Sequence, residues 1–185
     1  MKVIETKLHG CVVIEPTVFG DARGCFFETW NAERFAAQGL PDRFVQSNVS
    51  TSAQGVLRGL HYQWPRSQGK LVSVLEGEVY DVAVDIRRGS PTFGQWEAVM
   101  LSADNKKQFW IPEGFAHGFA VLSDRAVFSY LCTEVYLKEF DAGVRWNDAD
   151  IAVDWPVGAP TLSAKDERAP FLKDIAEDCL PVFMP

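Results

Sequence analysis

The chain contains three histidines, and imidazole is the side chain that most readily carries a proton near neutral pH. His61 lies in the stretch VLRGLHYQ and His117 in IPEGFAHGF, and each follows a glycine by a few positions and has aromatic neighbours. His9 lies in KLHG near the start of the chain, where we expect a role at the surface. His61 and His117 are therefore candidates for proton transfer, although a structural role fits either residue taken alone.

Polar side chains that could contact a substrate accompany these histidines. Arg58 lies three positions before His61, and a guanidinium beside a pocket histidine suits a phosphate ligand. Taken alone, Tyr130 equally fits a buried strand tyrosine, Lys70 a solvated turn lysine and Asp166 a helix cap. Other candidates form no local motif: Arg23, Glu28, Gln46 and Asn48.

Length and charge limit the classes of protein to consider. At 185 residues, with 47% hydrophobic and 12% aromatic residues, we expect one globular domain spanning residues 1–185. A net charge of −7 argues against a general nucleic-acid binder, whose surface is normally basic. A phosphorylated small substrate remains possible, because a few cations can converge in one pocket of an acidic protein.

The chain carries no obvious membrane or disulfide signal. It has no apolar run of about 18 residues, and its first residues, MKVIETKLHG, do not resemble a signal peptide. We therefore expect a cytoplasmic protein that does not bind membranes. The four cysteines form no CxxC pair, and we expect reduced, mostly buried thiols at Cys11, Cys25, Cys132 and Cys179.

The side chains named above must be positioned mainly by short segments that we expect to form β-strands. Apolar residues alternate with others over Val79–Ile86, which predicts a strand with one apolar and one partly polar face. A helix is predicted over Ala32–Gln38, with Asn31 as its N-cap and Gly39 as its stop, and a short helix is expected near the C-terminus. The other predicted strands, rich in β-branched and aromatic residues, are Cys11–Pro16, Phe44–Ser50, Leu71–Glu76, Trp96–Leu101, Gln108–Ile111, Phe119–Leu122 and Ala126–Cys132. Such a series predicts an all-β sandwich or a double-sheet jelly roll.

Several longer blocks resemble a known family over nearly the whole chain. They are FGDARGCFFETWN (19–31), FVQSNVS (44–50), GVLRGLHYQ (55–63), QGKLVSVLEGEVYDVAVDIRRGSPTFGQW (68–96), FWIPEGFAHGFAVLS (109–123), GVRWND (143–148) and LSAKD (162–166). In this order they are similar to the cupin-type dTDP-4-dehydrorhamnose 3,5-epimerases. The resemblance implies an all-β, double-stranded β-helix jelly roll with a few short helices, a homodimer and no cofactor.

The resemblance also implies roles for individual residues. His61 in RGLHYQ matches the general base, Tyr130 in FSYLC the general acid, and Asp166 in SAKD the carboxylate that orients the base. Lys70 in QGKL matches a lysine near the keto oxygen of the substrate. Positions that hold the nucleotide diphosphate and the sugar, some of them supplied by the partner subunit, are matched by Arg23, Glu28, Gln46, Asn48, Arg58, His117 and Lys165.

These residue types suit the chemistry that the family performs. Removing a proton from the carbon next to a ketone leaves negative charge on the carbonyl oxygen, so a base, a cation at that oxygen and an acid on the opposite face are needed. The family inverts C5 and then C3 of dTDP-4-dehydro-6-deoxy-D-glucose, a dTDP-linked 4-keto-6-deoxy sugar, and forms dTDP-4-dehydro-L-rhamnose for dTDP-L-rhamnose biosynthesis. The nearest alternative is a 3-only or 5-only epimerase acting on a related sugar.

Two positions depart from the family pattern. Asp141 in FDAGVRW stands where many members have a glutamate, and we still expect it to contact the substrate. Val135 in LCTEVY stands where members commonly have an aromatic residue, close to Tyr130, so substrate fit or stereochemical outcome could differ.

We also predict that Asp166 and His61 form a hydrogen-bonded pair. A histidine base presents one ring nitrogen to the substrate while the other needs an acceptor for its proton. Rival acceptors are Asp81 and Asp85, which lie on one face of the predicted strand Val79–Ile86.

Two other classes of jelly-roll protein are metal-dependent cupins and non-catalytic sugar-binding proteins. Metal-dependent cupins show a His-x-His pair with a further Glu and His, because a divalent metal needs three or four converging ligands. Here Gln63 stands two positions after His61, and only His117 remains as a partner. A non-catalytic sugar-binding jelly roll would need no acid and base in one pocket. We therefore expect an enzyme that works without a metal.

Overall fold

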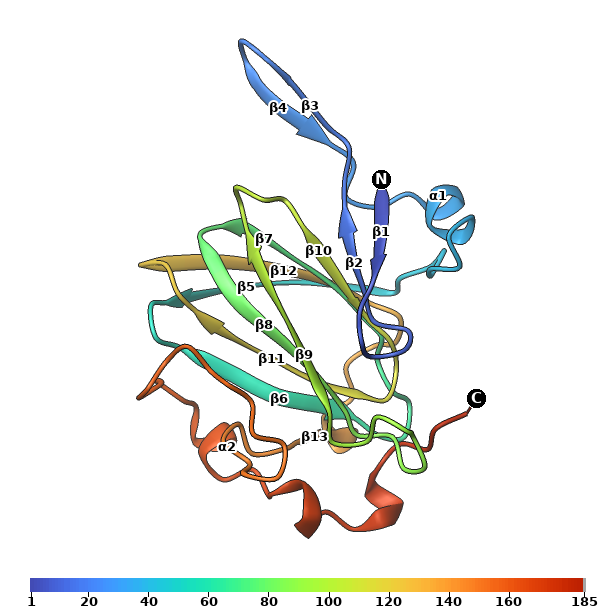
Figure 1. Cartoon of the computed structure of the whole chain (residues 1–185), viewed down its shortest axis with the longest axis vertical. Helices are drawn as coiled ribbons and strands as arrows, with labels where there is room; N and C mark the ends of the chain where they lie inside the picture. Colours follow the sequence, from blue (N-terminus) through green and yellow to red (C-terminus); the bar gives the residue numbers. More distant parts are fainter. Residues whose placement is uncertain (185) are drawn as a thin grey trace.

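Strands account for most of the regular structure in residues 1–184, which this computed structural model describes. They form two antiparallel sheets and a separate hairpin (Figure 1). The larger sheet has the order β1 (Lys2–Glu5), β2 (Val12–Glu15), β10 (Gln108–Ile111), β7 (Lys70–Glu76), β12 (Arg125–Cys132) and β5 (Gln46–Ala53). The smaller has the order β13 (Asp141–Gly143), β6 (Leu57–Gln63), β11 (Phe115–Val121), β8 (Glu78–Asp85) and β9 (Trp96–Ser102).

The two sheets enclose the main hydrophobic core. Successive side chains of a strand point to opposite sides, so every second residue of each strand faces this interior. The large buried side chains there include Val72, Phe109, Ile111, Phe115 and Phe128. This two-sheet antiparallel arrangement confirms the predicted jelly-roll class.

The strand β8 shows why one of its faces looked partly polar in the sequence. Val82 and Val84 pack on the outer side of the smaller sheet, in a second apolar cluster. Val79 and Ala83 face the interior, and Asp81 lies on the same side and is fully buried. The partly polar face is therefore turned inward, where polar side chains must find partners.

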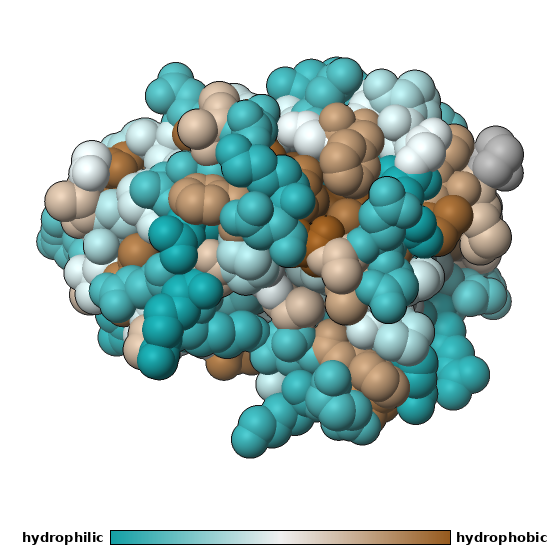
Figure 2. Space-filling model, turned by 90° about the horizontal axis from the view of Figure 1, so that it is seen from below, coloured by the Kyte–Doolittle hydropathy of each residue, from teal (hydrophilic) through white to brown (hydrophobic). Residues whose placement is uncertain are grey.

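The C-terminal segment covers the outer side of the smaller sheet (Figure 1). It contributes Leu172 and Leu180 to the second apolar cluster, together with Val144 and Ile151 from the preceding loop. Seen from below, where this segment lies, the surface is mostly hydrophilic with small apolar patches (Figure 2). Its helical elements are short: α2 (Ala164–Glu167), η2 (Leu172–Asp174) and η3 (Glu177–Cys179).

The hairpin of β3 (Val18–Asp21) and β4 (Gly24–Phe27) projects away from both sheets (Figure 1). Phe19 and Phe26 are 62% and 70% exposed. A hairpin of two four-residue strands with aromatic residues in water has no core of its own, and such hairpins are marginally stable in isolation.

Several sequence-based expectations need correction. The predicted C-terminal helix is two 3-10 turns, η2 and η3, because segments of three residues cannot complete an α-helical turn. The predicted helix at Asn31 is α1 (Ala32–Ala36), capped by the Asn31 side chain as expected, and a further 3-10 turn is η1 (Lys138–Phe140). Strands β1, β3, β4, β6 and β13 were not predicted.

The cysteines differ in how deeply they are buried. All four thiols are free, but only Cys11 and Cys132 are buried. The expectation of mostly buried thiols is wrong for Cys25, on the projecting hairpin, and for Cys179, in η3. Within residues 1–184, no helix is long and apolar enough to span a membrane.

Candidate active site

Polar residues of the interior line two adjoining cavities of about 230 Å³ and 220 Å³. Both cavities are lined by His61, Lys70 and Tyr130. The first is also lined by Gln46, Asn48, Tyr62, Gln63, Gln68, Tyr136 and Asp141. The second is also lined by Ser50, Arg58, His117, Phe119 and Phe128. The structure thus brings most of the predicted site residues together from six strands, β5, β6, β7, β11, β12 and β13.

His61 and Asp166 form the hydrogen bond that was predicted between them. His61 Nε2 lies 2.6 Å from Asp166 Oδ1, and the Asp166 side chain is almost fully buried while that of His61 is 33% exposed. Burial alone would raise the pKa of Asp166, but hydrogen bonds with His61 and Ser163 outweigh it and hold that pKa below its usual range. Asp166 is therefore an anion that accepts a hydrogen bond from the Nε2–H of His61. This leaves Nδ1 of His61 as the basic nitrogen.

A local irregularity in the strands puts Arg58 and His61 at the same cavity. Residues three apart on a regular strand point to opposite sides. Here the pairing of β6 with β11 shifts register between His117 and Phe119. The strands approach closely at this point: a Cβ at Gly59, whose φ is +122°, would lie 2.5 Å from the Cα of Gly118. Glycine at position 59 is therefore required beside the candidate base.

Arg58 is held in place by the neighbouring strand. Its Nε donates to Ser52 Oγ at 3.0 Å, and its Nη2 donates to the Thr51 carbonyl oxygen at 3.4 Å. Both partners belong to β5 of the larger sheet. Nη1 and the second N–H of Nη2 can still donate to an anion in the cavity.

Tyr130 and Lys70 approach the cavity from the sheet opposite His61. They lie on the adjacent strands β12 and β7, whereas His61 lies on β6 of the smaller sheet. Burial raises the pKa of Tyr130, so its hydroxyl is protonated at neutral pH. Burial lowers the pKa of Lys70, which makes its ammonium a readier proton donor than an exposed lysine. A histidine and two groups that can donate a proton therefore flank the cavity from opposite sheets.

The rival carboxylates have other partners. Asp81 accepts from His117 Nε2, with N–O distances of 3.0 Å and 2.9 Å. Burial raises the pKa of Asp81. Asp85 accepts from Arg87 and two hydroxyl groups in the following loop. Neither carboxylate contacts His61, so the alternative assignment is wrong. His117 and Asp81 thus form a second histidine–carboxylate pair. The ring of His117 stacks on Phe128 with the ring centroids 6.0 Å apart.

The rim of the first cavity contains an aromatic residue that was not predicted. Tyr136 Oη donates to Asp141 Oδ2 at 3.0 Å, and Lys165 Nζ donates to the same oxygen at 2.5 Å. Gln63 fixes the loop that carries Tyr136, since its Oε1 accepts from the Leu137 amide at 2.8 Å. Tyr136, next to Val135, thus supplies an aromatic side chain to this cavity, and the available signal was a tyrosine six residues after Tyr130.

Three predicted binding residues line neither cavity: Lys165, which bonds the rim residue Asp141, and the more distant Arg23 and Glu28. Arg23 is on the projecting hairpin, 90% exposed in its side chain, and pairs with Asp21. Glu28 follows the hairpin and pairs with Arg34 at 3.1 Å. The structure of one chain therefore does not bring Arg23 and Glu28 to His61.

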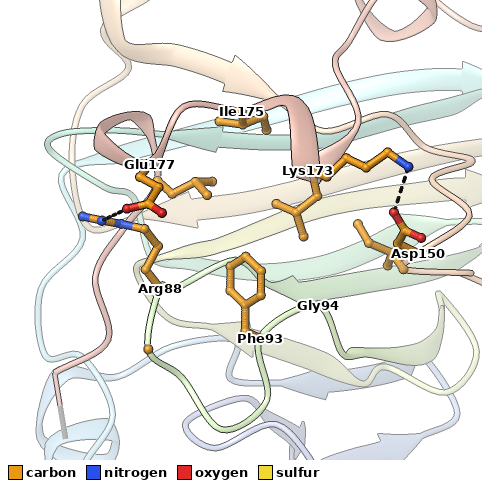
Figure 3. A pocket seen from close by; sticks show the side chains of 11 residues that line it. Arg88, Phe93, Gly94, Asp150, Lys173, Ile175 and Glu177 are labelled. Carbon is orange, nitrogen blue, oxygen red and sulfur yellow. Dashed lines mark hydrogen bonds and ion pairs between the residues drawn. The ribbon is translucent and has the colours of Figure 1, made fainter.

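A larger cavity of about 650 Å³ lies on the outer side of the smaller sheet (Figure 3). Its walls include Phe93 and Ile175, and its charged residues form two ion pairs, Arg88 with Glu177 and Lys173 with Asp150 (Figure 3). It contains no histidine and no tyrosine. The cavities around His61 are smaller, but they hold the groups that can move protons.

No cluster of metal ligands is found in the part of the chain that the structure describes. Residues 1–184 contain no group of three or more His, Cys, Asp or Glu side chains placed to hold a metal ion. At the site itself, the two histidines are each bonded to a different carboxylate.

Comparisons with known proteins agree on one family. The model of the family described as dTDP-4-dehydrorhamnose 3,5-epimerase matches residues 5–174. The Pseudomonas aeruginosa dTDP-4-dehydrorhamnose 3,5-epimerase is 52% identical over 183 residues, covering 98% of this chain and 100% of its own. The crystal structure of the Legionella pneumophila dTDP-6-deoxy-D-glucose-3,5-epimerase, in complex with dTDP-4-keto-L-rhamnose, matches with a TM-score of 0.97 and 53% identity. It covers 100% of this chain and 99% of its own.

A protein with a narrower activity has the same fold. A 3'-monoepimerase from Streptomyces bikiniensis, in complex with dTDP-quinovose, matches with a TM-score of 0.90 and 36% identity, covering 97% of this chain and 92% of its own. A family model that spans most of the chain, and relatives that are more than half identical over nearly all of it, lead to one conclusion: the chain belongs to the dTDP-4-dehydrorhamnose 3,5-epimerase family.

Proposed function

We propose that the protein is an isomerase that inverts C3 and C5 of dTDP-4-dehydro-6-deoxy-D-glucose and forms dTDP-4-dehydro-L-rhamnose. The observation that carries this proposal is a single cavity lined from both sheets. His61, which is hydrogen-bonded to Asp166, lies on the smaller sheet, and Tyr130 and Lys70 lie on the larger one. The family relationship supplies the substrate, because the Legionella pneumophila relative is described with dTDP-4-keto-L-rhamnose bound.

In the proposed mechanism, His61 Nδ1 removes the proton from the carbon next to the C4 ketone. Asp166 stabilises the imidazolium that forms, and the Lys70 ammonium stabilises the negative charge on the carbonyl oxygen. Tyr130 then delivers a proton from the opposite face, which inverts the centre. C3 and C5 flank the same ketone, so one set of groups serves both centres when the ring shifts between two bound positions.

Substrate binding is proposed to use the polar residues around this centre. Arg58, already oriented by Ser52, suits the diphosphate. His117, fixed by Asp81, lies beside it in the same cavity. The remaining proposed contacts are Gln46, Asn48, Asp141 and Lys165, of which Asp141 and Lys165 now pair with one another. Binding of the remote nucleotide would position the sugar for proton transfer.

We further propose a homodimer in which Arg23 and Glu28 act in the site of the partner. The support is the projecting hairpin, whose aromatic residues lie in water in the single chain. We also propose catalysis without a metal, supported by the lack of clustered metal ligands in residues 1–184. Activity should therefore survive extended treatment with a chelator. The cytoplasmic location stays a prediction.

The experiment that tests the function is conversion of dTDP-4-keto-6-deoxyglucose in deuterium oxide, followed by proton NMR. We expect deuterium at both C3 and C5 of the product. His61→Ala should reduce exchange at both carbons by about 10²- to 10⁴-fold, since no proton is removed without the base. Tyr130→Phe should retain more exchange than net epimerisation, because only reprotonation is impaired.

Matched controls are available in the same chain. Tyr80→Phe removes a hydroxyl from the outer side of β8, and His9→Ala removes a surface histidine, so both should leave turnover unchanged. Full and stereochemically correct turnover by Tyr130→Phe would remove it as the acid. Deuterium at one carbon alone would favour a single-centre epimerase, the second candidate, which shares this fold in the Streptomyces bikiniensis protein.

A further inference from the structure

The carboxylate of Asp166 is held at both of its oxygens. Oδ1 lies 2.6 Å from His61 Nε2, and Oδ2 accepts a hydrogen bond from Ser163 Oγ at 2.8 Å. Asp166 is only 3% exposed, and Ser163 is the residue besides His61 whose side chain bonds this carboxylate. A buried carboxylate oxygen without a donor carries a desolvation cost that no hydrogen bond offsets.

The same hydroxyl also begins the helix that carries Asp166. Ser163 is the N-cap of α2, and its Oγ accepts from the Asp166 amide at 3.2 Å. One hydroxyl therefore accepts from the backbone and donates to the side chain of the same residue. These two bonds fix the position of Asp166 and the rotation of its carboxylate. Helices of four residues are not stable alone, so this local anchor matters for α2.

We propose that Ser163 is a positioning residue for the reaction, acting through Asp166 to hold the carboxylate in line with His61 Nε2. The proposal rests on the proposed function only for its catalytic consequence. Ser163 lines neither cavity around His61, so it has no route to the substrate except through Asp166. Without the hydroxyl, the carboxylate is free to rotate and the Nε2 proton loses its fixed acceptor.

A helix cap and a carboxylate anchor make different demands on position 163. Glycine is nearly as good an N-cap as serine, whereas alanine is a poor one. Neither glycine nor alanine can donate to Asp166 Oδ2, whereas threonine can both cap and donate. The series Ser163→Gly, Ser163→Ala and Ser163→Thr therefore separates the two roles.

The first measurement needs no substrate. The proton on His61 Nε2 should give a downfield resonance in the wild-type protein, because its hydrogen bond to Asp166 is short and charge-assisted. We expect this resonance to persist in Ser163→Thr and to broaden or disappear in both Ser163→Gly and Ser163→Ala. Its loss in Asp166→Asn assigns it to this pair.

The second measurement is steady-state turnover. Ser163→Gly and Ser163→Ala should each lower kcat roughly tenfold with little change in KM, as expected for loss of one hydrogen bond to a charged group. Ser163→Thr should restore kcat. Thermal unfolding should show the alanine variant less stable than the glycine variant, since only the alanine variant loses the cap.

The outcomes are distinct. Wild-type kcat and an unchanged resonance in Ser163→Gly would show that the hydroxyl only caps the helix, and the proposal would be wrong. If the glycine variant does not fold, Ser163→Asp replaces it, because aspartate caps well but cannot donate to Asp166; an unchanged resonance there overturns the proposal equally. If the wild-type protein fails to turn over the sugar while the resonance series behaves as expected, the proposed function fails and the positioning role stands.

Discussion

The charge on Asp166 is what distinguishes His61 from the other histidine of the cavity. Both histidines contact a carboxylate, but their carboxylates have different surroundings. Asp166 also accepts from the Ser163 hydroxyl, and its pKa is held low. Asp81 is fully buried with its pKa raised, and the hydrogen bonds it accepts come from His117. At neutral pH the carboxylate beside His61 is thus the better stabiliser of an imidazolium.

This difference predicts unequal effects of two isosteric changes. Asp166→Asn should keep the fold but lower kcat about 10- to 100-fold, because a hydrogen bond to a charged group is worth about 1.5–3 kcal/mol. Asp81→Asn should act mainly on KM, since it orients a residue proposed to bind substrate. Steady-state kinetics of both variants make the comparison. A fall in kcat with Asp81→Asn, and none with Asp166→Asn, would move the catalytic pair to His117.

The pairing of His61 with Asp166 could not be predicted from the types and spacing of the residues alone. The two residues are 105 positions apart, and no spacing rule connects a strand residue with a residue of a four-residue helix. Resemblance to a family supplied the pair, and the structure supplied its geometry. The sequence did mark Asp81 as a plausible partner of a histidine, but the register of β8 against β11 pairs Asp81 with Phe119, so that its side chain bonds the diagonal neighbour His117.

Among the elements, strands with a regular pattern were predictable and irregular ones were not. The strand β10 matches its predicted bounds, Gln108–Ile111, and β8 differs by one residue at each end. The strand β6, which carries His61, was missed because Gly59 and the register shift beside it interrupt the alternation. A close approach of two strand backbones, which requires glycine, therefore weakens the pattern from which a strand is recognised.

The loop between β8 and β9 depends on one buried carboxylate. Asp85 is fully buried and accepts from Arg87 Nε and Nη2 and from the hydroxyl groups of Ser90 and Thr92. Burial raises the pKa of Asp85, but these hydrogen bonds outweigh it and the pKa is lowered overall. A carboxyl group whose pKa is lower in the folded state stabilises the fold above its unfolded pKa.

Stability should therefore depend on pH through Asp85. Its contribution is complete above about pH 4, the usual pKa of an aspartate, and is lost as the pH falls through the lower folded value. Asp85→Asn should destabilise the protein at pH 7 by about 3–5 kcal/mol, because the Arg87 charge is left without its buried partner.

Chemical denaturation at pH 7 and pH 3.5 measures this effect. The difference between wild type and Asp85→Asn should shrink at the lower pH. Asp42→Asn, at an exposed aspartate, serves as the control and should change the free energy of unfolding little at either pH. An Asp85→Asn variant as stable as wild type at pH 7 would show that the loop is held by its backbone bonds alone.

At the scale of the whole molecule, one chain contains the proposed catalytic groups but not all of the proposed binding groups. The base, the acid and Lys70 share a cavity, whereas Arg23 is carried away on the projecting hairpin. The hairpin exposes Phe19 and Phe26, and the sheet edge near the cavity exposes Val49. A second copy that receives this hairpin would cover apolar surface and place Arg23 beside the diphosphate in a two-fold symmetric exchange.

Subunit mixing tests this arrangement. His61→Ala and Arg23→Ala should each be impaired as pure dimers. If Arg23 acts in the partner's site, a mixed dimer has one site with both changes and one site with neither. After exchange to equilibrium, an equimolar mixture should recover about one quarter of the wild-type sites, since half of the dimers are mixed and each has one intact site. The measurement is turnover as a function of mixing time.

The control is a mixture of His61→Ala with Tyr130→Phe. These two residues line one cavity of the same chain, so both sites of every mixed dimer carry one change and turnover should not recover. Light scattering on each pure variant establishes that dimers are present before mixing. Recovery in the control mixture would mean that His61 and Tyr130 act in different sites, against the single-chain cavity that both line. No recovery in the first mixture despite demonstrated exchange would mean that Arg23 serves its own chain, and the hairpin would then have to fold back onto the cavity that it now leaves open.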